Sequence, residues 1–380
     1  MSGFVMREAQ AADNAGLLRL LGVAQPSRGV MLTFERAPDY FHSVAVTHEK
    51  PHILVAESRK SGEIVGVASF GTRQLFINGT EQAVRYGSDL RIAAEHQGSR
   101  LIIYITRAVR EVLQEQGWYQ AIILEDNQRT REVLEGARAG LPQYRANTGL
   151  ETWTLSGRKR KAEPASLSGL AVRRAAPDDI PGMNRFLRDM AAHYQFLPAY
   201  DFSSLLQDVP YFRGLTLDDF LLVHEGETLR GMVALWNQKA FKQTRVVGYN
   251  ALMTLLRPFY NVWARHFGGF VLPPAGGTFS YRVLHSLLTA PQDGAAFEAL
   301  LDAAWEESLR RDAGQSTTKT TTQSTTALTL TLADNDPRRS LLARFRSLSL
   351  RGRHYTVAFN EAAHPELDST RIPYFECGRL

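Results

Sequence analysis

The chain has 380 residues, of which 44% are hydrophobic and 22% charged, a balance typical of globular proteins. This length is too great for one ordinary core and predicts two domains of about 150–200 residues each. The net charge of +5 is a weak field for this length, and the single cysteine, Cys377, excludes an intramolecular disulfide framework and a multi-cysteine metal site.

No run of the sequence approaches the ~18 apolar residues that would suggest a membrane span. The first residues also lack the basic and then apolar succession of a signal peptide. We therefore expect a cytoplasmic protein with no membrane partner. Lys and Arg outnumber Asp and Glu by 44 to 39, which suits an anionic cofactor, but no dense basic stripe with interleaved aromatics is present, so we expect no nucleic-acid partner.

Two stretches of the chain resemble each other at a constant offset. The first contains Arg7 and Asp13, and the second contains Arg173 and Asp179. Each stretch predicts a short extended segment followed by a helix. We expect the aspartate to be the N-cap, because a carboxylate can accept hydrogen bonds from the free N–H groups of the first turn.

A hairpin is predicted next in each half, over residues 53–68 and 220–234, where apolar β-formers flank a polar turn that contains glycine. Later in each half an apolar strand, 121–125 or 328–333, leads into Asp-Asn and a helix. The shared order indicates two halves built in the same way.

The second half contains an additional segment between its hairpin and its later strand. Residues 238–275 make up most of it, and their apolar side chains at spacings of three and four predict a helical insertion. We expect this insertion mainly to pack, with a substrate-pocket wall or a subunit interface as alternatives. Residues 157–169 predict a linker, which gives domains 1–156 and 170–380.

Two further segments carry predictions. Residues 315–326 (QSTTKTTTQSTT) are of low complexity and predict a mobile loop. The last nine residues, 372–380 (IPYFECGRL), contain two aromatics that would otherwise expose apolar surface, so we expect them to pack on the body. His42, His48 and His52 are close in sequence but have no companion cysteine or acid pair, and we expect no metal site.

The segment that suggests chemistry is LRIAAEHQGSRLI, residues 90–102. It predicts the end of a strand, a short loop with Gly98 and the start of a helix that runs to about residue 116. At such a junction the free N–H groups of the first helical turn favour an anion. The junction alone is a weak signal, because many α/β loops contain a glycine.

The complete order of predicted elements gives the junction more weight. Strand, helix, hairpin, strand, glycine loop, helix, strand with Asn127, helix and final strands resemble the GCN5-related N-acetyltransferase family. Residues 90–102 look like the acetyl-CoA motif of that family, in which a strand leads to (Gln/Arg)-x-x-Gly-x-(Gly/Ala) and Gln97 occupies the first position. The resemblance covers residues 5–156 and, more weakly, 170–360.

The resemblance implies a mixed α/β fold with two tandem acyl-CoA N-acyltransferase domains, each with a sheet of the same topology. It implies that acetyl-CoA is the cosubstrate of the first domain, with its pantetheine arm between strands 88–93 and 121–125 and its carbonyl near the backbone N–H of Ile92. The residues then expected at the cofactor are Arg91, Ile92, Gln97, Gly98, Ser99, Arg100, Leu101, Ile102 and Asn127.

In such an enzyme the acceptor amine attacks directly, so a proton must be removed from an ammonium group by a carboxylate or a water chain. Asp89 and Glu125 are carboxylates on the two strands, and Tyr86 offers a hydroxyl just before the first. The acceptor stays open between a small-molecule amine and a peptide amine. Whether the protein forms a homo-oligomer also stays open.

The chain departs from the family's pattern at three places in the first half. Arg100 and Ile102 stand where the family has Gly and then Gly or Ala, which allow close approach of backbone to the pyrophosphate. Arginine can replace some of that binding by its charge. Leu134 stands where the family usually has a tyrosine acid.

The second half departs further from the family's pattern. Asp293 puts a negative charge near the place where the phosphate of a cofactor would lie, and Phe297 stands where Gly or Ala is expected. We therefore expect this half to be structural or substrate-binding and not catalytic. Two other functions remain open for the whole chain. One is a catalytically degenerate fold used as a binding or assembly module, and the other is a tRNA-dependent aminoacyl transferase.

Overall fold

The structure is a computed structural model that describes all residues except 1–2, 24, 28, 114–116, 137–139, 160–168, 268 and 316–326. Residues 316–326 of the predicted loop and most of the predicted linker at 157–169 therefore lie outside the described residues, whereas Gln315 is helical.

The first half contains the elements that the sequence predicts, in the same order, and three more between the first helix and the hairpin. The strands and helices of this half are β1 (Phe4–Glu8), α1 (Asn14–Leu21), β2 (Gln25–Ser27), β3 (Val30–Glu35), α2 (Tyr40–Thr47), β4 (Lys50–Ser58), β5 (Ile64–Ile77), β6 (Thr80–Ile92), α3 (Leu101–Val112), β7 (Trp118–Leu124), α4 (Gln128–Glu135) and β8 (Gln143–Arg158). The three additional elements are β2, β3 and α2.

The second half repeats this order with an insertion. Its elements are β9 (Leu170–Arg174), α5 (Ile180–Met190), β10 (Tyr194–Gln195), β11 (Leu197–Pro198), β12 (Phe220–Glu225), β13 (Thr228–Trp236), β14 (Gln243–Tyr249), α6 (Ala251–Phe267), β15 (Arg282–Thr289), α7 (Gly294–Gln315), β16 (Leu328–Ala333), β17 (Phe345–Ala358) and β18 (Ile372–Pro373).

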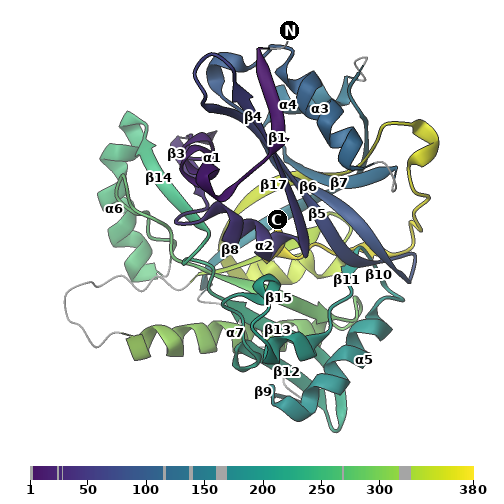
Figure 1. Cartoon of the computed structure of the whole chain (residues 1–380). Helices are drawn as coiled ribbons and strands as arrows, with labels where there is room; N and C mark the ends of the chain where they lie inside the picture. Colours follow the sequence, from purple (N-terminus) through teal and green to yellow (C-terminus); the bar gives the residue numbers. More distant parts are fainter. Residues whose placement is uncertain are drawn as a thin grey trace.

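One mixed sheet runs through the molecule in the order β1-β4-β5-β6-β7-β17-β8-β16-β15-β13-β12-β9, with β11 paired to β5 (Figure 1). The predicted fold class, a mixed α/β sheet, is confirmed. Helices cover both faces, since alternate side chains of a strand point to opposite sides. In β4, Ile53 and Val55 pack in the cluster with α1 and α2, whereas Leu54 and Ala56 pack in the cluster with α3.

The last strands of the two halves change places. β8 pairs with β16 of the second half, β17 pairs with β7 of the first half, and β8 and β17 pair antiparallel with each other along their full lengths. The prediction of two separate sheets is therefore wrong, because this exchange joins them into one. The domain bounds 1–156 and 170–380 stay a prediction.

The sequence repeat reappears as matching geometry, although without the predicted capping hydrogen bonds. Arg7 binds Asp13 at 2.7 and 2.8 Å, and Arg173 binds Asp179 at 2.7 and 2.6 Å. Each aspartate also accepts the backbone N–H three residues before it, at 2.7 and 2.8 Å. Each aspartate occupies the N-cap position of its helix, as predicted, but its carboxylate points back and closes a short 3-10 turn, so the expected hydrogen bond to the first helical turn is wrong.

The insertion predicted as helical over 238–275 is a strand followed by a helix. β14 pairs antiparallel with β3 of the first half, and Arg245 of β14 binds Glu35 of β3 at 2.8 Å. Only α6 is helical. The start of the insertion is therefore a strand, because it pairs with the edge of β3 in a small sheet of the order β14-β3-β2.

The last nine residues pack in the seam between the halves, as predicted. Arg379 is 1% exposed and donates hydrogen bonds to the Val46 carbonyl of α2 at 2.5 Å and to the Tyr211 carbonyl at 2.7 Å. Its guanidinium lies 3.5 Å from the centre of the Tyr211 ring. One buried cation therefore links both halves to the end of the chain.

Producing residues 1–158 alone tests the importance of the strand exchange. Without the second half, β7 and β8 lose the strand that lies between them, so we expect the fragment to show no cooperative thermal transition. Mixing it with residues 169–380 should restore one. Calorimetry is the measurement, and a cooperative transition in the isolated fragment would contradict this account.

Candidate functional site

Two parallel strands of the first half separate and leave a wedge. β6 and β7 pair only through Arg85↔Tyr119, Tyr86↔Gln120 and Gly87↔Ala121. Beyond these pairs β6 stays with β5 on one side, and β7 stays with β17 on the other. We call the space between residues 88–92 of β6 and residues 122–124 of β7 the first wedge.

A β-bulge opens the first wedge. The β5–β6 register shifts so that Asp89 and Leu90 of β6 lie opposite Ala68 alone. Asp89 has a φ of +49°, a left-handed conformation that aspartate adopts more readily than most residues. An extra residue on one strand bends that strand, which accounts for the departure of β6 from β7.

Charged and aromatic side chains surround the bulge. The Asp89 carboxylate lies 3.3 Å from an Arg36 nitrogen and accepts from the Tyr40 hydroxyl at 3.3 Å. Tyr86 is 4% exposed, and the Arg73 guanidinium lies 3.6 Å from the centre of its ring. Burial raises the pKa of Tyr86, so its hydroxyl stays protonated at neutral pH.

A lysine from the insertion reaches the same place. Lys242 donates a hydrogen bond from Nζ to the main-chain oxygen of Leu380 at 2.5 Å. Burial, and then the positive charge of Arg36, lower the pKa of Lys242 to about 7, while Asp89 opposes that shift. The site thus contains an amine that can gain or lose a proton near neutral pH. Sequence reasoning missed this residue, because a lone lysine in a predicted helix carries no signal.

Of the three side chains predicted to be catalytic, two lie at the bulge. Tyr86 and Asp89 are there, together with Arg36 and Arg73, which sequence reasoning also missed. Glu125 lies past the end of β7, where its backbone N–H donates to the Arg351 carbonyl of β17 at 2.9 Å. No described contact connects Glu125 with the group around Asp89.

The predicted glycine loop stands between β6 and α3. Gly98 has a φ of +79°, and nothing lies within 4 Å of the place where its Cβ would be. The Ser99 hydroxyl accepts the Leu101 N–H at 3.2 Å, and the Gln97 side chain donates to the Ile92 carbonyl at 3.3 Å. The space beside Gly98 is therefore open at the start of a helix, which is a favourable place for an anion, although the Leu101 N–H already has the Ser99 hydroxyl as a partner.

The other residues predicted to bind the cofactor differ in how far their side chains are exposed. Arg100 is exposed and Arg91 is partly buried at the two ends of the loop. Leu101 is fully buried in the core under α3, so only its backbone can face a ligand, whereas Ile102 is half-buried. Asn127 caps α4 by accepting the Thr130 N–H at 3.4 Å.

A second wedge lies in the second half, in the corresponding place. β15 and β16 pair in parallel through Arg282↔Leu328 and Val283↔Thr329 only. The β13–β15 register also shifts at a bulge, where Ser286 has a φ of +50° and corresponds to Asp89. This position has an internal partner, because the Glu376 carboxylate accepts the Ser286 N–H at 2.9 Å.

The helix start beside the second wedge is also filled from within the chain. Asp293 accepts the Ala296 N–H at the start of α7 at 3.0 Å and binds Arg230 at 2.8 Å. Phe297 is fully buried in the core. The two places where backbone N–H groups would attract an anion are therefore both taken by the protein's own carboxylates.

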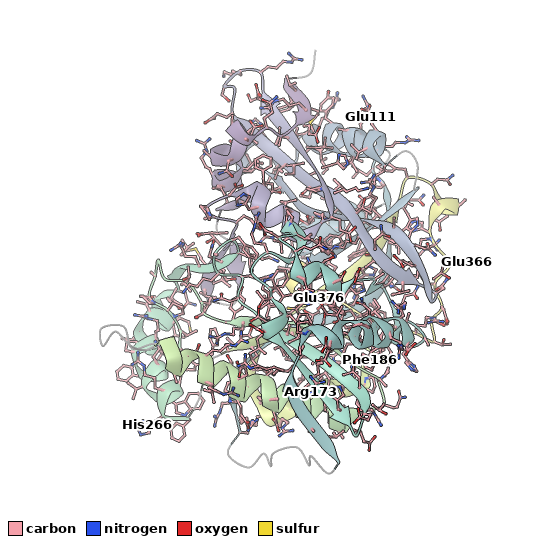
Figure 2. All side chains as sticks on the ribbon, turned by 60° about the horizontal axis from the view of Figure 1, so that its bottom comes forward. Glu111, Arg173, Phe186, His266, Glu366 and Glu376 are labelled. Carbon is pink, nitrogen blue, oxygen red and sulfur yellow. The ribbon has the colours of Figure 1, made fainter. Side chains whose placement is uncertain are left out.

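Of two cavities, one lies next to the β6–β7 pairs and the other lies at the far strands of the sheet. A cavity of about 20 Å³, large enough for about one water molecule, is lined by residues that include Tyr86, Gln120, His354 and Glu376. It lies between the β6–β7 pairs and the last residues of the chain. A larger hollow of about 410 Å³ is lined by residues that include Arg173, which is labelled in Figure 2, and it lies beside β9 and β12, the last two strands in the sheet order.

The described residues contain no group of three or more His, Cys, Asp or Glu that could hold a metal ion. The three histidines near the first hairpin lie apart. His48 is buried with Nε2 3.0 Å from the Ser88 hydroxyl, His42 lies 3.3 Å from Asp39, and His52 lies 3.8 Å from Glu8. Among the described helices, none has the length and apolar character needed to cross a bilayer.

The fold is similar to solved acyltransferase structures. A GCN5-related N-acetyltransferase from Sphaerobacter thermophilus has a TM-score of 0.56 and 12% identity, over 98% of this chain and 99% of that one. N-myristoyltransferase from Saccharomyces cerevisiae, with bound myristoyl-CoA, has a TM-score of 0.55 and 10% identity, over 94% and 79%. A glucosamine N-acetyltransferase region of a fungal β-N-acetylglucosaminidase has a TM-score of 0.57 and 11% identity, over 94% and 38%.

No protein-family model and no curated sequence matches the chain. The structural similarity nevertheless covers nearly all of it. The chain has the fold of the GCN5-related N-acetyltransferases, as the sequence predicts, and this fold includes both halves.

Glu376 provides a pH test of the second wedge. Burial raises its pKa to about 7, against the opposing effects of the Ser286 N–H and Arg379. Its protonated form therefore favours the folded state. That contribution is complete below the ordinary pKa of 4.5 and is lost as the pH rises through about 7, a change of roughly 3 kcal/mol.

We expect Glu376→Gln to keep an acceptor for the Ser286 N–H and to remove this loss, so that the variant gains stability over wild type as the pH rises from 4.5 to 7. Urea unfolding at a series of pH values measures it. Glu366→Gln is the matched control, because Glu366 is exposed on the same segment (Figure 2). Parallel stability curves for wild type and Glu376→Gln would contradict the assignment.

Proposed function

We propose that the protein is an N-acyltransferase that moves an acetyl group from acetyl-CoA to a primary amine. The observation that supports this proposal is the contrast between the two wedges. In the second, Glu376 and Asp293 take the N–H groups of the bulge and of the helix start. In the first, the corresponding places carry the Asp89 bulge and the open Gly98 loop.

The same contrast suggests how acetyl-CoA would bind. The pantetheine arm would lie along the separated edges of β6 and β7, where Leu90 and Leu124 are 40% and 36% exposed. The pyrophosphate would lie against the backbone of residues 98–102 at the start of α3, with Arg100 as a cationic partner. The second half, whose corresponding places are filled, would support the first and bind no cofactor.

The Glu376 contact also suggests which backbone group polarises the acetyl carbonyl. In the second wedge the N–H of Ser286 points at an oxygen 2.9 Å away. Since Asp89 holds the corresponding bulge position with almost the same φ, we propose the Asp89 N–H for this role, in place of the group near Ile92 suggested by the family resemblance. A fixed donor aimed at the developing oxyanion lowers the barrier.

The proton transfers then fall to two side chains. The acceptor nitrogen attacks the carbonyl carbon, and the neutral Lys242 amine takes the proton that the ammonium must lose. The nitrogen of the tetrahedral intermediate must lose a second proton to become the amide. When the C–S bond breaks, the Tyr86 hydroxyl can give its proton to the thiolate and take up this second proton in return, a role that Leu134 cannot fill. Asp89 would hold Arg36 and Tyr40 in place around the bulge.

Calorimetric titration of CoA tests the binding site. A helix start contributes about 0.3–1 kcal/mol per interaction, and a charge-assisted contact from arginine contributes about 1.5–3 kcal/mol. We therefore expect Arg100→Ala to weaken binding by roughly tenfold or more, since ~1.4 kcal/mol is a factor of ten. Arg107→Ala, an exposed arginine of the same helix, should bind as wild type does.

Two results would change the conclusion. If wild type fails to bind CoA at millimolar concentration, the fold acts here as a binding or assembly module. If Arg100→Ala binds as well as wild type, the pyrophosphate does not depend on that guanidinium. Ile102→Gly adds a direct measure of crowding, because it should strengthen binding although it costs the helix about 1 kcal/mol.

The pH dependence of acyl transfer tests Lys242. A base with a pKa of about 7 must be neutral to act, so we expect kcat/KM to rise as the pH increases through about 7. Lys242→Met should remove this limb and lower the rate by about 10²-fold or more. Release of free CoA, measured with a panel of primary amines, is the assay.

Lys239→Met is the matched control, because Lys239 is exposed three residues before Lys242. Its profile should match that of wild type. If the limb near pH 7 persists in Lys242→Met, the proton acceptor is a different group.

A further inference from the structure

Helix α6 presents apolar side chains to the solvent. Its exposed positions form a stripe with helical spacing, which we call the α6 stripe, and the two most exposed members are Phe259 at 72% and Leu255 at 67%. The stripe consists of Leu252, Leu255, Leu256, Phe259, Val262, Trp263 and Phe267. The packing role expected from the sequence is thus wrong for these residues.

The helix is attached to the body by a polar contact. Asn261 is buried on the inner side of α6, where its amide donates to the Leu272 carbonyl and accepts the Leu272 N–H, both at 2.9 Å. Ala264 is the other buried residue of the helix. The amphipathic pattern is therefore inverted relative to an ordinary surface helix, whose apolar face points to the core.

Isolated exposed leucines are common on soluble proteins, but a contiguous apolar patch marks an interaction surface. At 100° per residue the α6 stripe occupies somewhat more than a third of the helix circumference. It lies on the outer side of the molecule, with His266 at the outermost end (Figure 2). The helix stands beside β14 and β3 and apart from α3 and α4 (Figure 1).

The charged side chains of α6 itself have one sign, since the helix contains arginines and no Asp or Glu. The sequence from residue 228 to residue 292 contains no Asp or Glu. On α6 the cations are Arg257 and Arg265. Other arginines of this stretch bind carboxylates, because Arg230, Arg245 and Arg282 pair with Asp293, Glu35 and Asp312. The end of the stripe also has a cation from β17, since the Arg346 guanidinium lies 5.8 Å from the centre of the Trp263 ring and donates to the Phe267 carbonyl.

We propose that α6 docks on an anionic lipid surface. The α6 stripe would enter the boundary between headgroups and acyl chains, with Trp263 at the depth that its amphipathic ring favours. Arg265 and Arg346 would meet the anionic headgroups. A second copy of the chain fits less well, because pairing two stripes would bring their cationic surroundings together. This inference does not depend on the proposed acyl transfer.

Vesicle flotation tests the proposal with the full-length protein. We expect wild type to bind vesicles of phosphatidylcholine with phosphatidylserine at least tenfold better than vesicles of phosphatidylcholine alone, and to bind less well as salt increases. The triple variant Leu255→Asn, Phe259→Asn, Trp263→Asn should lose at least tenfold in binding. Because these positions are exposed, its thermal unfolding should stay close to that of wild type.

The matched control is Leu206→Asn with Leu309→Asn, two exposed leucines on other elements, at 61% and 47%. It should bind as wild type does, whereas Arg265→Glu should bind anionic vesicles more weakly. Two results would overturn the proposal. One is equal binding of wild type and the triple variant to anionic vesicles, or none by either. The other is a dimer of wild type in light scattering that the triple variant converts to a monomer, which would assign the stripe to a second copy.

Discussion

The antiparallel pair of β8 and β17 is the contact on which the rest of the structure depends. Each of these strands is the last that its half contributes to the large sheet, yet each pairs with strands of the other half. This pairing has a direct effect on the first wedge. A strand that leaves its neighbour exposes unpaired N–H and C=O groups. β7 can separate from β6 because β17 holds its opposite edge along its whole length.

The same bulge and the same separation of strands occur in both halves, but the halves differ in what lies against them. A bulge N–H and the start of a helix both favour negative charge. In the second half the chain fills these places with the carboxyl groups of Glu376 and Asp293. Burying Glu376 costs free energy, which its raised pKa reports, but the carboxylate satisfies the backbone and closes the second wedge. Only the first wedge is left with an open glycine loop.

The sequence predicts the features that depend on neighbouring residues, and it fails where contacts are distant. Hairpins, the Gly98 loop and the helix after it follow from local patterns, and so does the repeat that contains Arg7 and Arg173. The exchange of β8 and β17 does not, because both read as ordinary final strands. The exposure of Phe259 is equally hidden, since the apolar spacing of α6 is the same for a helix that packs and for one that docks.

The site follows the same rule for one of the residues that sequence reasoning missed, because Lys242 comes from the second half, whereas Arg36 and Arg73 come from the first. Lys242 lies in the insertion that also contains β14, and β14 is fixed to the first half by its pairing with β3. The chain continues from β3 into α2, whose Tyr40 contacts Asp89 at the bulge. The pairing of β14 with β3 thus fixes the position of Lys242 relative to α2 and the Asp89 bulge.

The end of the chain makes a similar connection. Arg379 binds carbonyl groups of both halves, and the main-chain oxygen of Leu380 holds Lys242. Glu376 closes the second wedge only a few residues earlier. The last residues of the chain therefore fill the second wedge, and they also contact Lys242 beside the first wedge. In the proposed reaction the second half would therefore contribute a group to the first, although its own places for an anion are taken.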